Sequence, residues 1–280
     1  MLSLFLLSSL VLPSSLEPLG AIPAPQAPPL AQGQPRSTRI NPSPLVNQLA
    51  QAPITGDYRV TALQPDFTGS LWVGSWTGLT RINPENGRIQ QRVRVPSRTI
   101  EALAQDRVGR IWVGTFDGLV RVDPRTNTIT ARNTELPSNR VHALLIDSRG
   151  FLWAGTDRGL AMISPDRGLL MTTLENLAGV SANALSLDRN HHLWVGTLDG
   201  LVQVNTATAF PLRRVGNLPG SVVQTLALDG PGNLWVGTPS GLLVVDPVRA
   251  ELVRSVTAMR GRSVQAVAFD REGNLWAGTS

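Results

Sequence analysis

The chain has 280 residues, a net charge of +5 and no cysteine. The absence of cysteine excludes a disulfide framework, a thiolate metal site and a lipid-attached cysteine. All 25 basic residues are arginine and they are spread along the chain, so no basic block indicates nucleic-acid binding. No partner of that kind is expected.

The N-terminal residues 1–24 are expected to form a secretory signal segment. Met1 to Leu12 is an apolar run that Pro13 ends, and small residues follow near Gly20 and Pro23. The run is too short to span a bilayer, so the mature chain is expected to have no integral membrane span. The expected location is periplasmic or secreted, or cytoplasmic if the apolar run is not a signal. Residues 25–35 are rich in Pro, Ala and Gln, which is typical of a linker.

From residue 36 to the end the sequence predicts one repeat domain. A tryptophan returns at intervals of 40 or 41 residues, at Trp72, Trp112, Trp153, Trp194, Trp235 and Trp276. Each lies in a short apolar segment that ends in Gly-Thr or Gly-Ser, and an Asp-x-x-Gly turn precedes it, with His191 in place of Gly in the fourth copy. The Gly of the Gly-Thr pair is expected to let a neighbouring backbone or ring approach closely.

Four short strands in each copy predict an all-β fold, a β-propeller of four-stranded antiparallel blades. The sixth copy stops at Ser280 after two strands, whereas residues 38–42 repeat residues 80–84 letter for letter. We therefore expect six blades, with residues 36–57 and 262–280 completing one blade between them. The alternative is a truncated ring of seven blades.

The motif Leu-Trp-Val-Gly-Thr-x-x-Gly-Leu after an Asp-x-x-Gly turn resembles the two-component regulator propeller repeat. The resemblance covers residues 58–280, as five full copies and one partial copy. It implies a sensing or binding module that commonly lies outside the membrane, ahead of a transmembrane helix and a histidine kinase. The sequence shows neither of those parts, so the resemblance does not carry kinase activity over.

Positions that differ between otherwise similar copies are the candidates for ligand binding. Eleven residues before each Trp, the copies carry six polar side chains, which we expect to form a polar ring near one mouth of the axial channel: Thr61, Glu101, His142, Asn183, Gln224 and Gln265. The alternative is that they bind channel water or link blades. The turns after the Trp strands and the blade connections add Trp76, Phe116, Asp117, Arg140, Asp157, Arg158 and Asp199, on a face of mixed charge.

The expected function is a non-catalytic, sensor-type binding propeller whose ligand is a small molecule, a saccharide or a protein. Neither a cofactor nor a metal is expected, since no metal-ligand spacing, calcium loop or phosphate loop is present. One alternative is a lyase or lactonase that uses Glu101 and His142, because a histidine and an acid in adjacent copies can act as general base and acid. The other alternative is a structural scaffold for protein assembly.

Overall fold

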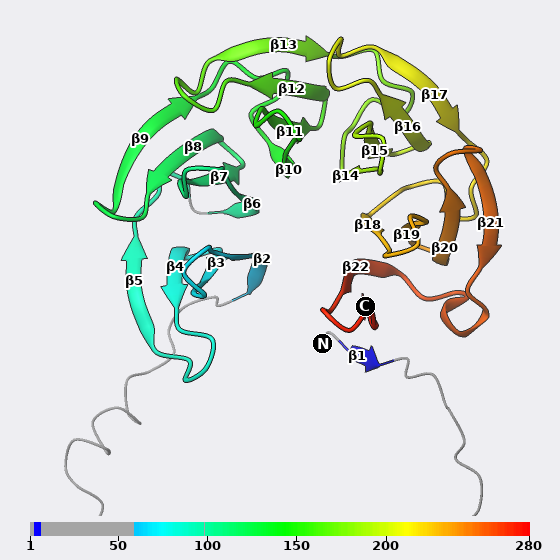
Figure 1. The fold of residues 1–280 in the computed structure, drawn as a ribbon, viewed down its shortest axis with the longest axis horizontal. Coiled ribbons are helices and arrows are strands. Elements are labelled where there is room, and N and C mark those ends of the chain that lie inside the picture. Colours follow the sequence, from blue (N-terminus) through cyan, green and yellow to red (C-terminus); the bar gives the residue numbers. More distant parts are fainter. Residues whose placement is uncertain (1–2, 7–58, 98) are drawn as a thin grey trace, which may run out of the picture. The chain divides into compact units, whose positions relative to one another are not determined.

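A computed structural model describes residues 3–6, 59–97 and 99–280 of the chain. These residues form six antiparallel sheets, five with four strands and one with three. Figure 1 shows the sheets around a central space, and in the five four-stranded sheets the first strand faces that space and the fourth lies on the outside. The chain is an all-β propeller, as the repeat predicts.

Each four-stranded sheet is one repeat, and its strands lie in chain order. The first two sheets contain β2 (Val60–Pro65), β3 (Leu71–Ser75), β4 (Gly78–Ile82) and β5 (Ile89–Val93), then β6 (Ile100–Gln105), β7 (Ile111–Thr115), β8 (Gly118–Asp123) and β9 (Thr128–Asn133). The third and fourth contain β10 (Val141–Ile146), β11 (Leu152–Thr156), β12 (Gly159–Ile163) and β13 (Leu170–Leu174), then β14 (Ala184–Leu187), β15 (Leu193–Thr197), β16 (Gly200–Val204) and β17 (Pro211–Val215). The fifth contains β18 (Thr225–Leu228), β19 (Leu234–Thr238), β20 (Gly241–Asp246) and β21 (Glu251–Ser255).

The sixth sheet has the strand order β1-β23-β22 and follows a short 3-10 turn, Thr257–Met259. Its strands are β22 (Val264–Phe269), β23 (Leu275–Thr279) and β1 (Ser3–Leu6). β1 pairs with β23 at the third-strand position that residues 38–42 were expected to take. Residues 36–57 themselves, and the signal and linker segments apart from β1, lie outside the described residues, so the predicted closure by them stays a prediction.

The repeated tryptophans pack between neighbouring sheets, as predicted. Trp72 lies in one apolar cluster with Ile100 and Val113 of the second sheet, and Trp112 lies with Val141 and Leu152 of the third. The four rings Trp72, Trp112, Trp153 and Trp194 are almost completely buried. Because each large ring is buried against the next repeat, the blades stabilise one another through their faces.

The glycine two residues after the Trp, within the same strand, allows the next sheet to come close. A Cβ on Gly114 would lie 2.6 Å from the side chain of Val141, and one on Gly155 would lie 2.3 Å from the carbonyl oxygen of Ala182. Real Cβ atoms do not approach other atoms so closely, so glycine is required where the first strand of the next blade packs.

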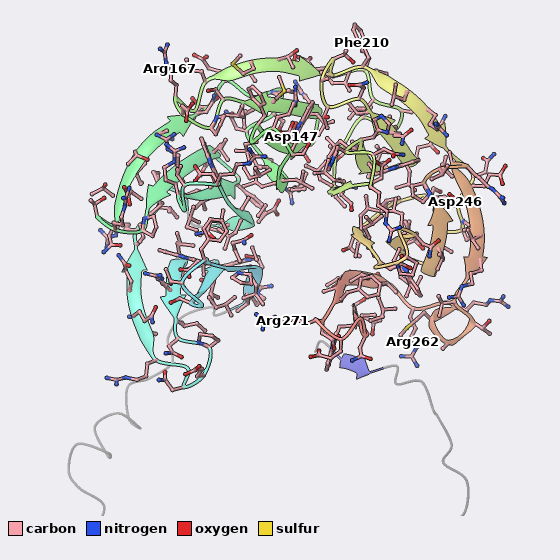
Figure 2. The ribbon with its side chains drawn as sticks, viewed as in Figure 1. Asp147, Arg167, Phe210, Asp246, Arg262 and Arg271 are labelled. Atoms are coloured by element: carbon pink, nitrogen blue, oxygen red, sulfur yellow. The ribbon has the colours of Figure 1, made fainter. Side chains whose placement is uncertain are left out.

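In five of the six copies the Asp of the turn before the Trp strand has a second role that the sequence did not indicate. The turn forms as expected: Asp147 Oδ1 accepts the backbone N–H groups of Arg149 and Phe151. Its other oxygen accepts the indole N–H of Trp153 at 3.1 Å. Asp66, Asp188, Asp229 and Asp270 bind their tryptophans in the same way. Figure 2 labels Asp147 on the inner part of its blade, whereas Phe210 points outward from the rim.

Candidate functional site

A cavity of about 390 Å³ is lined by five of the six polar side chains expected to form a ring. These are Thr61, Glu101, His142, Asn183 and Gln224, one from each of the first five repeats. The sixth, Gln265, is exposed on β22 and is not among the residues that line this cavity. The repeat therefore brings five side chains, far apart in sequence, to one place.

The backbone explains how these side chains reach the cavity. In the pairing of β10 with β11, Val141 lies opposite Thr156 and Ala143 opposite Gly155, which leaves His142 as an extra, unpaired residue. The same register shift falls at Thr61, Glu101 and Gln265. Such β-bulges re-aim a side chain out of the regular alternation of a strand. In these four copies the variable position is a bulge position, which the strand pattern alone did not indicate, whereas Asn183 and Gln224 lie directly before β14 and β18, whose pairings have no register shift.

Two ring residues link neighbouring blades through neutral hydrogen bonds. The hydroxyl of Thr61 donates to the carbonyl oxygens of Gly74 and of Ile100, the latter in the next blade. The amide of Asn183 donates to the carbonyl oxygen of Val223 at 3.3 Å. These contacts agree with the alternative role of the ring as a set of links between blades.

Glu101 and His142 are in direct contact, as their equivalent positions in adjacent copies suggest. His142 Nδ1 lies 2.8 Å from Glu101 Oε2, and His142 Nε2 lies 2.5 Å from Asp157 Oδ1. Asp157 comes from the turn between β11 and β12. Since both ring nitrogens face carboxylate oxygens, neither is free to coordinate a metal.

The two carboxylates change the protonation of the histidine. Burial lowers the pKa of His142, but hydrogen bonds and charge interactions with Glu101 and Asp157 outweigh it, so the pKa lies above its ordinary value. Arg140 lies 3.3 Å from the other oxygen of Glu101. The cluster therefore holds two carboxylates and two basic groups within hydrogen-bonding distance of one another.

Two exposed aromatic rings in the turns each carry a stacked arginine. Arg140 lies over the ring of Phe116 at 4.4 Å, and Arg59 lies over the ring of Trp76 at 3.8 Å. Trp76 is 41% exposed and Phe116 is 39% exposed. Sequence reasoning missed Arg59, although the arginine directly before the first strand recurs in the first and third copies.

The remaining predicted site residues lie in the turns after the Trp strands. Asp117 and Arg158 are exposed, and their backbone N–H groups donate to the hydroxyls of Thr115 and Thr156. Asp199 forms an ion pair with Arg214 of the outer strand β17. None of these three is among the residues that line the 390 Å³ cavity.

A larger hollow of about 1450 Å³ lies against the first sheet. Its lining is mainly apolar and includes Leu63, Leu71, Val73 and Ile82. The equivalent side chains of the second sheet, such as Leu103 and Val113, are covered by the preceding blade. This hollow is thus a face of the first blade that the described residues leave open, and the polar cavity is the candidate site.

A family model described as two-component regulator propeller matches residues 94–117, 135–158 and 217–240. Each match contains a turn, a first strand and the Trp strand of one repeat. The chain carries two-component regulator propeller repeats. A search of curated protein sequences found no match.

The propeller is similar to solved extracellular domains of putative sensor systems from B. thetaiotaomicron. The domain of a hybrid two-component system is 21% identical with a TM-score of 0.68, covering 78% of this chain and 32% of that one. The domain of a one-component system is 23% identical with a TM-score of 0.66, covering 79% and 31%. The chain spans about a third of the length of these domains.

The propeller is also similar to virginiamycin B lyase from Staphylococcus aureus, at 13% identity and a TM-score of 0.66, covering 81% of this chain and 82% of the lyase. A catalytically inactive variant of that lyase, solved with quinupristin, matches equally well. At these identities the likenesses show the fold. Within the described ranges, no helical segment has the length and apolar character that a membrane crossing requires.

Proposed function

We propose that the chain is a non-catalytic, extracytoplasmic binding propeller of the sensor type. Its repeats match those of two-component regulators, and it is similar to the extracellular domains of a putative hybrid two-component system and of a putative one-component system. The apolar N-terminal run, predicted from the sequence as a signal segment, agrees with export, in which case strand β1 belongs to the precursor chain alone. We propose the cavity lined by the five polar ring residues as the ligand site.

The proposal rests on the contrast between the residues that recur in every copy and the polar ring residues, which differ from copy to copy. Trp, Asp and Gly recur from copy to copy, because each packs a blade or forms a turn. The position eleven residues before the Trp carries Thr, Glu, His, Asn and Gln in the five copies that line the cavity. A wall with mixed donors and acceptors on a repeated scaffold suits recognition of one polar, asymmetric ligand.

The geometry favours a small polar molecule or a single saccharide unit in the cavity, while Trp76 and Phe116, each with an arginine over its ring, lie in the turns outside the cavity lining. In Gln224, Oε1 accepts the hydroxyl of Ser263 at 3.2 Å, which leaves its amide N–H groups for a ligand. A protein that docks on the same face is the larger alternative, since the turns there carry Asp117, Arg158 and Asp199.

The test is a thermal-shift and calorimetric screen of the full chain against sugars, oligosaccharides, amino acids and short peptides. A ligand that binds wild type and loses about tenfold or more in affinity in Gln224→Ala supports the proposed site. Gln90→Ala is the matched control, because Gln90 is exposed on the outer strand β5. A ligand that binds both variants equally well contradicts the site, and a chain that binds nothing in the screen contradicts the function.

A lyase of the propeller type is the second candidate, and the contact between Glu101 and His142 favours it. A histidine held between two carboxylates can remove or deliver a proton, and the inactive lyase variant that shares this fold carries an alanine in place of a histidine. Incubation with quinupristin, with product formation followed by mass spectrometry, tests this activity. Turnover by wild type that His142→Ala abolishes supports the lyase, whereas unaltered substrate with wild type counts against it.

The third candidate is a scaffold for protein assembly. A scaffold should show neither turnover nor binding of a small ligand. It should instead bind a protein partner, and Gln224→Ala should leave that binding unchanged. Cross-linking in cells that produce the full chain, followed by identification of the partner, separates this outcome from the first two.

A further inference from the structure

The contact between the second and third blades differs chemically from the other ring contacts. Thr61 and Asn183 donate to backbone carbonyl groups of the following blade, and Gln224 accepts a hydroxyl from the segment that enters the sixth sheet. These links are neutral. Glu101 of β6 instead binds His142 of β10, so the link between these blades contains groups that gain and lose protons.

The histidine is enclosed by groups from each segment around it. β6 supplies Glu101, the turn between β11 and β12 supplies Asp157 with Arg158 beside it, and the segment before β10 supplies Arg140. The ring neighbour from the fourth blade is Asn183, which is neutral. The imidazole side chain is only 18% exposed, so its proton is held mainly by protein groups.

We propose that Glu101, His142 and Asp157 form a proton-binding site that makes the junction of the second and third blades, and the charge of the cavity wall, respond to pH. With His142 protonated, one imidazolium joins carboxylates from two blades. When the proton leaves, at most one ring nitrogen can still donate, so one of the two carboxylates loses its partner. The cavity wall then loses the positive charge of the imidazolium, and its net charge falls by one unit.

The raised pKa of His142 determines whether the junction becomes more or less stable as the pH rises. The pKa of His142 is raised in the folded chain by its two carboxylate neighbours, against the effect of burial. A raised pKa adds stability that is fully present below the unfolded value of about 6.5 and is lost as the pH rises through the folded value. The junction is therefore strongest below about pH 6.5 and weakens as the pH rises through the folded pKa of His142.

The decisive experiment is an NMR titration of the histidine side chains in the full chain. His191→Asn and His192→Asn variants assign the other two histidines, which leaves the signals of His142. We expect its pKa above about 6.5 in wild type, and a fall in that pKa in both Glu101→Gln and Asp157→Asn. A wild-type pKa at or below 6.5 overturns the proposal without any variant of the site.

A second measurement tests the effect on the junction. The folding equilibrium constant, from urea unfolding between pH 5 and 9, is compared in wild type and His142→Gln. As the pH rises, the folding equilibrium constant of wild type should fall relative to that of the variant. The expected fall is up to about tenfold for each unit by which folding raises the pKa of His142. Parallel pH profiles would contradict the coupling. Both readouts concern a proton, so they stand whether or not the cavity binds the proposed ligand.

Discussion

At the scale of single residues, His191 occupies a conformation that glycine takes in the other copies. The last turn residue has φ values of +83° at Gly69, +92° at Gly109 and +95° at Gly150, whereas His191 has φ +62°. The left-handed region costs a residue with a Cβ about 1–2 kcal/mol, and glycine loses about 0.5–1 kcal/mol through its larger freedom when unfolded. The fourth copy therefore carries a local strain that the other turns avoid.

We predict that His191→Gly stabilises the chain by about 0.5–1 kcal/mol, the difference between these two effects. The histidine is exposed, and its backbone carbonyl, which accepts the hydroxyl of Thr206, remains after the substitution. Urea unfolding measures the change. Asn190→Gly is the control, because Asn190 lies in the same turn without a positive φ, and it should be neutral or destabilising. A loss of stability in His191→Gly would show that the side chain makes a contact that matters more than the backbone strain.

Trp112 shows how one neighbour alters a repeated contact. Its indole N–H is buried without a partner, whereas the five equivalent tryptophans donate to the Asp six residues before them. In the second copy Arg110 donates to that oxygen of Asp106 at 2.6 Å, and it also reaches the carbonyl oxygen of Pro165 in the next blade. The second copy thus replaces a bond within one blade by a link between two blades.

At the scale of strands, the contact between blades depends on the glycine in each Trp strand. We predict that Gly155→Ala in β11 destabilises the chain by at least about 2–3 kcal/mol, because overpacking forces the backbone to move. The new Cβ would lie 2.3 Å from the carbonyl oxygen of Ala182, a backbone atom that cannot rotate away. Thermal and urea unfolding measure the effect.

Gly230→Ala is the matched control for that strand substitution. Gly230 lies in the turn after β18, has no positive φ and has no atom within 4 Å of the added Cβ. Its substitution should change stability by less than about 0.5 kcal/mol. Equal effects at the two positions would mean that the close approach of β11 to the next blade does not limit stability.

The strands show which parts of the fold and the candidate site the sequence could predict. Strand order, turns and the packing of the Trp rings follow from local spacing repeated six times, so comparison of the copies predicted them. The meeting of Glu101 with His142 followed in the same way, since equivalent positions of adjacent blades lie side by side. The bulge could not be predicted, because a register shift depends on how a strand pairs with its partner.

The side-chain contacts between residues far apart in the chain could not be predicted from the sequence either. Asp157 reaches His142 from a turn 15 residues away, and Arg110 reaches Pro165 across 55 residues. Each contact depends on the rotamer of one side chain, and the same position in other copies carries other residue types. Nothing in the spacing of the sequence distinguishes these side chains from solvated surface residues.

At the scale of the whole molecule, the repeated Asp residues predict sensitivity to acid. Desolvation raises the pKa of Asp147, but bonds from Arg149, Trp153 and the backbone outweigh it, so the pKa lies below its ordinary value. The pKa values of Asp66, Asp229 and Asp270 are lowered as well. Lowered values add stability that is present above the unfolded pKa of about 3.9 and lost as the pH falls through the folded values.

We therefore expect the melting temperature to fall steeply from about pH 4 downward. Calorimetry over a pH series measures it. Asp147→Asn should be less stable than wild type at neutral pH but should lose less on acidification, because that residue no longer takes up a proton. If the two curves remain parallel down to pH 2, the carboxylate of Asp147 does not contribute to the acid response.

The blades should also differ in stability according to which faces are covered. Leu63 of the first sheet is 58% exposed, whereas the equivalent Leu103 of the second is 8% exposed. Strand β11 of the third sheet is buried throughout, and β3 of the first is only partly buried. Local opening requires less free energy where fewer apolar contacts break, so amides of 71–75 should exchange with deuterium faster than those of 152–156.

A pair of valines at equivalent positions turns this difference into a measured energy. Val195→Ala in β15 removes a fully buried side chain and should cost about 1.5–3 kcal/mol. Val73→Ala in β3 removes a partly buried one, which lines the uncovered hollow, and should cost less than about 1 kcal/mol. Equal costs, together with equal exchange of the two strands, would show that the face of the first blade is covered in solution. Unequal costs would identify the first blade as the part of the propeller that opens first. The middle blades around His142 would then keep the candidate site in place.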